Sequence, residues 1–248
     1  MTHIKSFTVL LGITFALPLF ILILLPHMGF RDLSAVAYSE DELEFAEGSV
    51  YPPGVAGRVT NGRDVYQAEG CAYCHTQMVR PTKALGFDAW RKGWTGRGPN
   101  WEGDEGKPVP NRLTRPEDYL GEDYAFLGIQ RNGPDLSNVG WRITSEEEVH
   151  RHLYSPRSVN IRSNMPGFKH LYKVQQIGGG PSDEALKLEG EHAAKDGYEV
   201  IPTAKAEALA SYLMSLKKDF LVPASAGGPG VNASAPAAAA DAGAPTKP

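Results

Sequence analysis

The two cysteines of this chain stand three positions apart, and a histidine directly follows the second one. Cys71, Cys74 and His75 therefore form a C-x-x-C-H motif, and the sequence contains no other cysteine. A shuffled chain of this composition would contain the motif with a probability of roughly one in two thousand, so chance explains it poorly. Because no further cysteine exists, neither a disulfide framework nor a four-cysteine zinc site can organise the fold.

The spacing of the motif predicts covalent attachment of one haem c. Two thiols separated by two residues can add to the two vinyl groups of one porphyrin, and the next histidine then places its imidazole under the iron. A thioredoxin-like redox pair also uses C-x-x-C, but it occurs in a βαβ context and does not require the histidine. We therefore expect Cys71 and Cys74 to hold the haem, with His75 as the proximal iron ligand.

An iron that only carries electrons needs a sixth ligand, which is usually methionine. Met165 is the expected ligand, because it stands in a proline-fixed loop that can reach the haem face opposite His75. Met78 is too close to His75 in the sequence to do so, and Met214 is expected to pack as core on a helix. Bis-histidine ligation is the alternative, and the competing residues are His150, His152 and His170.

Three further residues are expected to support the haem. Pro134 lies in a Gly-Pro-Asp turn, and its carbonyl oxygen is expected to accept a hydrogen bond from the second ring nitrogen of His75. The alternative interpretation of Pro134 is an ordinary turn. Arg131 and Arg142 are expected to neutralise the haem propionates, since guanidinium groups pair well with carboxylates. Arg157 is a further candidate for the same role.

An uncharged and mostly apolar run near the N-terminus predicts a membrane anchor. Residues 7–25 contain no charged side chain, and as a helix they would span about 28 Å, close to the hydrocarbon thickness of a bilayer. We assign the anchor to residues 7–26 and place residues 1–6 in the cytoplasm. Since c-type haem is attached outside the cytoplasm, the rest of the chain is expected in the periplasm. A cleaved signal peptide is the alternative, but the run is longer than a usual signal segment.

Three helices are predicted within residues 59–222. The first covers residues 62–68, with an N-cap at residues 60–61, and leads into the cysteine motif. The second covers residues 145–154, capped by its initial serine in a capping box. The third covers residues 203–218 and begins at a threonine cap. Its apolar residues recur at helical spacing, namely Ala206, Leu209, Ala210, Leu213 and Leu216.

The remaining segments carry turn-forming or low-complexity sequence. Residues 27–58 combine acidic residues with prolines and are expected to form a periplasmic linker. Residues 83–119 are rich in Gly, Pro, Trp and Arg without periodicity, which predicts a long ordered loop. Residues 223–248 consist almost entirely of Ala, Gly, Pro and Ser, so this tail is expected to be disordered.

Several runs of the sequence resemble the mono-haem subunit II of cbb3-type cytochrome c oxidases. Residues 69–81, around the cysteine motif, are more specific than C-x-x-C-H alone, and the similarity keeps its order and spacing over most of residues 60–217. The other runs that carry the resemblance are residues 131–136, 139–142, 152–157, 163–166, 198–203 and 212–213.

The resemblance implies a role in respiration at the bacterial inner membrane. The chain would take electrons from a donor cytochrome and pass them to a catalytic subunit that reduces oxygen, beside a further cytochrome c subunit. It would contain no catalytic centre of its own, and its haem would be held by Cys71 and Cys74 with His75 and Met165 as axial ligands. The alternatives are the haem subunit of a nitric oxide reductase-like complex, a haem-based redox or gas sensor, and an assembly scaffold.

The expected fold is mostly α-helical. It combines one N-terminal transmembrane helix with a class I-like cytochrome c domain that has long loops and a disordered C-terminal tail. Gly62 and Tyr66 of the first helix are expected to contact Tyr212 and Leu213 of the last one, with glycine allowing close approach. The formal net charge of −4 gives no electrostatic case for nucleic-acid binding.

Overall fold

The structure, a computed structural model, falls into two units, residues 1–35 and residues 36–248. Among the residues that the structure describes, helices dominate both units and the strands form two small antiparallel pairs. Arg131, most of the loop predicted at 83–119 and all of the tail after residue 226 lie outside the described residues. The described residues are 2–31, 33–44, 48–55, 57–79, 114–130, 132–143, 145–218, 220 and 222–226.

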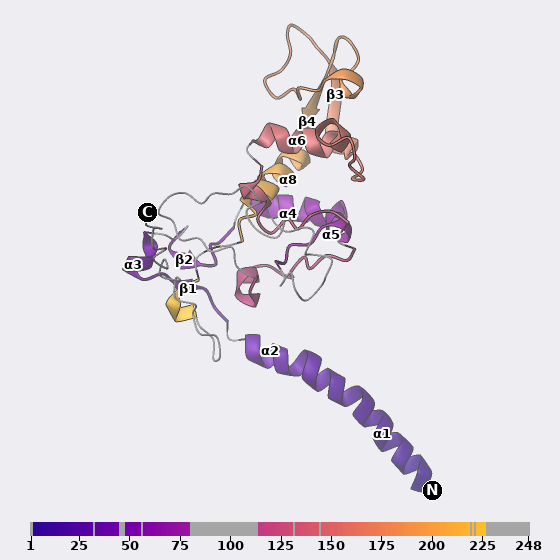
Figure 1. Cartoon of the computed structure of the whole chain (residues 1–248), viewed down its shortest axis with the longest axis vertical. Coiled ribbons are helices and arrows are strands. Elements are labelled where there is room, and N and C mark those ends of the chain that lie inside the picture. The colour runs from indigo at the N-terminus through magenta and orange to yellow at the C-terminus, as the bar shows by residue number, and fades with distance from the viewer. Residues whose placement is uncertain are drawn as a thin grey trace, which may run out of the picture. The chain divides into compact units, whose positions relative to one another are not determined.

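The N-terminal unit is one continuous helical rod (Figure 1). It consists of α1 (Thr2–Leu19), the π-helical turn η1 (Phe20–Leu24) and α2 (Leu25–Phe30). From His3 to Phe30 the rod is long and apolar enough to cross a membrane. The prediction of one such helix is confirmed, and the helix extends beyond the predicted bounds of residues 7–26 at both ends.

The π-helical turn lies between two prolines. Pro18 is inside α1 and Pro26 is in the first turn of α2, so each removes one backbone N–H from the rod. A wide turn is a common way to accommodate missing or displaced hydrogen bonds within a helix. Pro18 therefore does not end the helix.

The first part of the second unit is more ordered than a linker. Strand β1 (Val36–Ala37) pairs antiparallel with β2 (Val50–Tyr51), and the short helix α3 (Glu40–Leu43) lies between them in sequence. Tyr51 is 1% exposed, and its hydroxyl donates to the buried carboxylate of Asp118 at 2.8 Å. Residues 36–51, predicted as part of a linker, therefore belong to the folded unit.

Two helices that are distant in sequence cross at the centre of this unit. Helix α4 (Arg58–Ala68) lies against α8 (Ala204–Ser215), and α6 (Glu146–Tyr154) packs beside α8 (Figure 1). At the crossing, a Cβ on Gly62 would lie 1.9 Å from the carbonyl oxygen of Ala208. Only glycine permits this approach, as the sequence predicted.

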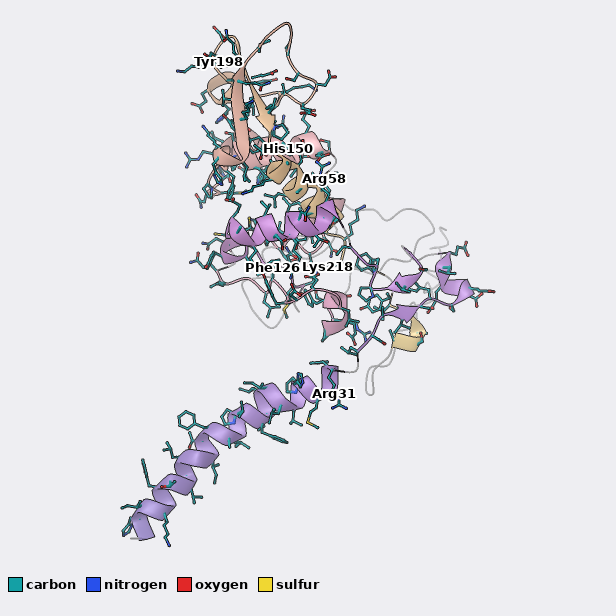
Figure 2. The ribbon with its side chains drawn as sticks, turned by 180° about the vertical axis from the view of Figure 1, so that it is seen from behind. Arg31, Arg58, Phe126, His150, Tyr198 and Lys218 are labelled. Carbon is teal, nitrogen blue, oxygen red and sulfur yellow. The ribbon has the colours of Figure 1, made fainter. Side chains whose placement is uncertain are left out.

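Aromatic rings continue the contact along the crossing. The rings of Tyr66 and Tyr212 meet edge to face with centroids 5.5 Å apart, and Phe126 lies 5.0 Å from Tyr66. Figure 2 shows Phe126 and Lys218 on one side of α4 and His150 on the other. The buried core comprises Tyr66, Phe126, Leu136, Val139, Val149, Leu153, Tyr154, Leu171, Tyr172, Val200, Ala206, Leu209, Ala210, Tyr212, Leu213 and Leu216.

The caps predicted for the second and third helices are confirmed. The hydroxyl of Ser145 accepts from the N–H of Glu148 at 3.2 Å. The hydroxyl of Thr203 accepts from the N–H of Ala206 at 3.5 Å. Helix α8 ends at Ser215, three residues before the predicted end. Helix α4 begins at Arg58, so the N-cap predicted at residues 60–61 was wrong. Gly57, with a φ of 60°, is the actual N-cap.

An antiparallel hairpin was not predicted. Strand β3 (Tyr172–Gln176) pairs with β4 (Tyr198–Pro202), with Val174 opposite Val200. A long loop, residues 177–197, joins the strands, so no short turn sequence marks the pair. The remaining short elements are α5 (Cys71–Cys74), η2 (Pro116–Tyr119), η3 (Val139–Trp141), α7 (Pro156–Val159), η4 (Lys169–Leu171), η5 (Gly190–His192) and η6 (Ala224–Ala226).

Replacing Gly62 should disrupt the helix crossing. In a Gly62→Ala variant the new methyl group would meet backbone atoms of Ala208, which cannot rotate away, and the Cβ of Tyr212 at 2.7 Å. We expect a loss of about 3 kcal/mol in the free energy of unfolding, measured by chemical denaturation. Gly179→Ala, where no atom lies within 4 Å, is the matched control and should be near neutral. Equal stability of the two variants would contradict this account of the crossing.

Candidate functional site

The cysteine motif forms a single helical turn directly after α4. Gly70 has a φ of 73°, a left-handed conformation that ends α4 and starts α5 (Cys71–Cys74) in a new direction. The N–H of His75 donates to the carbonyl of Cys71 at 3.0 Å and closes the turn. Cys71 and Cys74, three residues apart in a helical turn, therefore lie on the same face of α5.

The orientation of the His75 ring is fixed by one hydrogen bond. Its Nδ1 lies 2.9 Å from the carbonyl oxygen of Pro134, which can only accept, so Nδ1 carries the proton. Burial lowers the pKa of His75, an effect that the bond to Pro134 opposes, and the ring is neutral near pH 7. Nε2 then keeps its lone pair, and no described residue donates to it. The hydrogen bond predicted between Pro134 and His75 is present.

A second segment lies along the motif and holds it by backbone hydrogen bonds. This strap comprises residues 126–130 and 132–137. Gly133 donates to the carbonyl of Cys74 at 2.9 Å, and a Cβ on this glycine would lie 2.2 Å from Cε1 of His75. The glycine thus lets the strap lie flat against the imidazole ring. The other bonds are Gln77 N to Phe126 O, Ile129 N to Ala72 O, Gln130 N to Tyr73 O and Leu136 N to Thr76 O.

The carboxylate of Asp135 joins the strap to the motif. Asp135 is 5% exposed, and its oxygens accept from the Thr76 hydroxyl at 2.5 Å and from the N–H groups of Met78 and Ser137 at 2.9 Å. Three donors compensate the cost of burying one negative charge. Sequence reasoning identified the Gly-Pro-Asp turn but missed this role of the aspartate, because two of its three partners lie near residue 77.

Helix α8 also reaches the site. The hydroxyl of Tyr212 donates to Oε1 of Gln77 at 2.9 Å, and both side chains are buried. Gln77 is fully buried, so this contact ties the segment after His75 to the main helix crossing. Neither side chain was predicted to hold the site, although Tyr212 was expected in the crossing.

The other residues considered as iron ligands or as partners of the haem propionates lie in different parts of the unit. Met165 is half-buried against the hydrophobic core, and its N–H donates to the Ser163 hydroxyl at 3.2 Å. Arg142 donates to the backbone carbonyl of Asp135 at 2.6 Å, which brings its guanidinium to the strap, and burial lowers its pKa. Arg131 lies outside the described residues. Met214 packs against the core, as predicted.

Two of the three competing histidines are engaged elsewhere. His170 lies 2.7 Å from Glu69 at the surface. His150 is buried and bonded to the Tyr172 hydroxyl at 3.0 Å. His152 is half-buried, and burial lowers its pKa.

The burial of the motif argues against a reactive thiol pair. Burial raises the pKa of the Cys71 thiol to about 12, with Glu69 adding to the effect, whereas redox-active thiols require a lowered pKa. Among the residues that the structure describes, no three His, Cys, Asp or Glu side chains gather to bind a metal ion. A porphyrin supplies four iron ligands itself, so His75 and one further residue would suffice.

Neither the protein-family models nor the curated proteins match this chain. The resemblance to the oxidase subunit therefore rests on the sequence runs alone.

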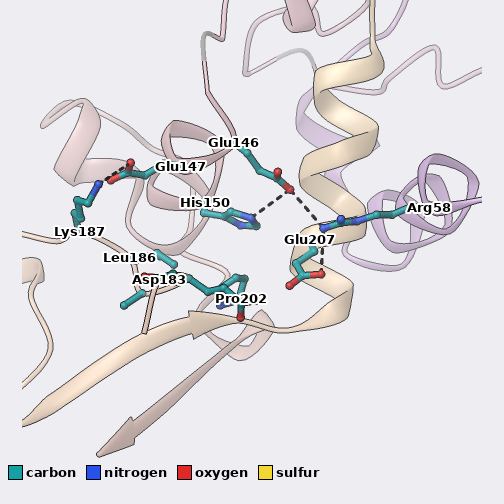
Figure 3. A pocket seen from close by; sticks show the side chains of 11 residues that line it. Arg58, Glu146, Glu147, His150, Asp183, Leu186, Lys187, Pro202 and Glu207 are labelled. Carbon is teal, nitrogen blue, oxygen red and sulfur yellow. Dashed lines mark hydrogen bonds and ion pairs between the residues drawn. The ribbon is translucent and has the colours of Figure 1, made fainter. Parts of the chain in front are cut away.

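A charged hollow of about 430 Å³ lies where α4, α6 and α8 begin (Figure 3). Arg58 contacts the carboxylates of Glu207 at 3.0 Å and Glu146 at 3.5 Å. Nε2 of His150 faces Glu146 at 3.8 Å. Because the Tyr172 hydroxyl donates to the carbonyl of His150 at 3.1 Å, Nδ1 of this histidine must donate to that hydroxyl.

Loss of the Asp135 carboxylate should destabilise the site. Asp135→Asn replaces one acceptor oxygen with a donor that faces N–H or O–H groups. We expect a loss of about 2 kcal/mol in the free energy of unfolding, because a buried charge-assisted acceptor is removed. Asp196→Asn, at an exposed position, is the control and should change stability by less than about 0.5 kcal/mol. Unchanged stability of Asp135→Asn would show that the three bonds are not stabilising.

Acid should weaken the fold through His150. Burial lowers its pKa below the ordinary value of 6.5, against the opposing effect of Glu146 and Glu207, and Arg58 adds to the lowering. Folding thus favours the neutral ring, and stability is lost as pH falls below the unfolded-state pKa. Between about pH 7.5 and pH 5 the native chain should lose more unfolding free energy than His150→Gln, measured by denaturant titration at each pH. Parallel pH profiles for the two proteins would refute the assignment.

Proposed function

We propose that this chain is a membrane-anchored, mono-haem c-type cytochrome that passes electrons to the oxygen-reducing subunit of a cbb3-type oxidase. The observation that carries the proposal is the tautomer of His75. A histidine directly after two cysteines of one helical turn donates through Nδ1 to the carbonyl of Pro134 and presents Nε2 with a free lone pair. An iron ligand of this kind requires that protonation pattern.

The residues around the motif fit a covalently held haem. Cys71 and Cys74 would each form a thioether bond to the porphyrin, and His75 and Met165 would be the axial iron ligands. When bound, the haem supplies a one-electron couple between ferrous and ferric iron. Gly133 leaves room for the imidazole ring, and the strap holds that ring in place. Arg142, together with Arg131, would neutralise the propionates.

The N-terminal rod supports the membrane location. Every described side chain of α1, η1 and α2 is exposed, and the rod is long enough to span the hydrocarbon layer. We place it in the bacterial inner membrane, with residues 1–6 in the cytoplasm and the haem domain in the periplasm. The catalytic subunit and a further cytochrome c subunit would be its partners in the membrane complex.

Optical spectra of the purified full chain test the haem and its ligands. We expect the ferric protein to show the weak far-red band of sulfur ligation and the ferrous protein to exclude carbon monoxide. Met165→Ala should abolish that band and admit carbon monoxide, because it removes the sixth ligand. Met78→Ala is the matched control and should leave both properties unchanged.

Two other results would count against the proposal. Carbon monoxide binding to the native ferrous haem would favour a gas or redox sensor with an open sixth position. A chain that retains no haem after denaturing electrophoresis would exclude covalent attachment.

Cys71→Ser and Cys74→Ser should each leave at most one thioether bond.

The identity of the complex needs a separate experiment. A tagged full chain purified from its native membranes should carry oxygen-reducing activity with it. If the purified material reduced nitric oxide and not oxygen, the chain would serve the same electron-transfer chemistry in the alternative complex.

A further inference from the structure

A continuous basic segment surrounds the loop that carries Met165. Residues 151–176 contain five arginines and lysines and no aspartate or glutamate, in a chain whose net charge is −4. The rest of the chain is therefore more acidic than the net charge indicates. The cations are Arg151, Arg157, Arg162, Lys169 and Lys173.

These cations are not neutralised within the described part of the chain. Arg157, Arg162, Lys169 and Lys173 are exposed, and none of them forms an ion pair with a described residue. Ion pairs do form elsewhere on the same unit, as between Lys187 and Glu147 at 3.3 Å. The basic segment therefore presents its charge to the solvent.

Local contacts hold both sides of the Met165 loop against neighbouring parts of the unit. Nε of Arg157 donates to the carbonyl of Ser163 at 3.4 Å, which folds α7 against the loop before Met165. The Lys169 ammonium lies 5.4 Å from the centre of the Tyr154 ring, which places the far side of the loop at the end of α6. Lys173 follows on β3. Cations therefore flank Met165 on both sides.

Apolar side chains are exposed among these cations. Val159 is 39% exposed and Ile161 is 74% exposed, close in sequence to Arg157 and Arg162. Apolar residues with a charged rim are the usual composition of a protein–protein interface. The positive rim would select a negatively charged partner and speed its encounter.

We propose that this basic surface docks an acidic, soluble electron carrier, so that electrons enter through the loop that carries Met165. The entry of electrons rests on the function proposed above, whereas the docking of an acidic protein can be tested without the haem. A soluble protein is favoured over a lipid surface because the exposed apolar side chains lie on a four-residue helix and a loop, and not along one face of a long amphipathic helix. Lipid binding is one of the outcomes of the test.

Surface plasmon resonance on the full chain tests the docking. The chain is held in nanodiscs of neutral lipid, and the probe is a soluble blue-copper protein with an acidic surface. Binding should weaken by at least about tenfold between about 20 mM and about 200 mM NaCl. Arg162→Glu/Lys173→Glu should lose at least about tenfold in affinity at the lower salt concentration. Both side chains are exposed, so the fold should persist.

The matched control carries the same charge change at another place. Lys195→Glu/Lys205→Glu reverses two exposed lysines outside the segment and should alter affinity by less than about twofold. Equal losses in both variants, or none in either, would overturn the proposal. Binding to anionic vesicles but not to the copper protein would also overturn it, in favour of a lipid surface. Charge-dependent docking by a chain without haem would refute the proposed function and leave the docking surface standing.

Discussion

The close approach of α4 and α8 at Gly62 is the contact on which the rest of the second unit depends. A backbone this near leaves no side chain between the helices, so the aromatic rings of Tyr66 and Tyr212 meet directly. The same face of α8 then reaches the site, where the Tyr212 hydroxyl holds Gln77. Further along α8, the carbonyl of Met214 lies against Gly140. A Cβ on this glycine would lie 2.2 Å from the carbonyl oxygen of Met214. One helix thus positions both the cysteine motif and the segment that follows the strap.

The strap makes the geometry of His75 a property of the polypeptide itself. Gly133, Pro134 and Asp135 are consecutive, yet they contribute in different ways. Gly133 leaves space for the imidazole ring, the carbonyl of Pro134 accepts from it, and Asp135 joins the strap to the motif. Since these contacts involve backbone and buried groups, the hydrogen bonds and packing of the polypeptide hold the imidazole. Under the function proposed above, such preorganisation would lower the cost of changing the charge on the bound iron.

Features determined by neighbouring residues could be predicted, and features determined by distant ones could not. The caps Ser145 and Thr203 and the apolar spacing of α8 are local, and the structure confirms them. The pairing of β3 with β4 depends on strands separated by a long loop, and the role of Asp135 depends on partners near residue 77. The contact between Pro134 and His75 was predicted because its turn sequence is distinctive, but its haem function remains a proposal.

Helix α6 links the acidic and the basic parts of this unit. Its first turn contains three glutamates and its last turn contains Arg151 and His152, an arrangement that the helix dipole favours at both ends. The first turn therefore contributes Glu146 to the hollow around Arg58, whereas the last turn leads into the basic segment around Met165. The charge distribution that stabilises the helix also separates the charged hollow, which includes His150, from the proposed docking surface. Acidification would thus alter His150 while the cations of the basic segment keep their charge.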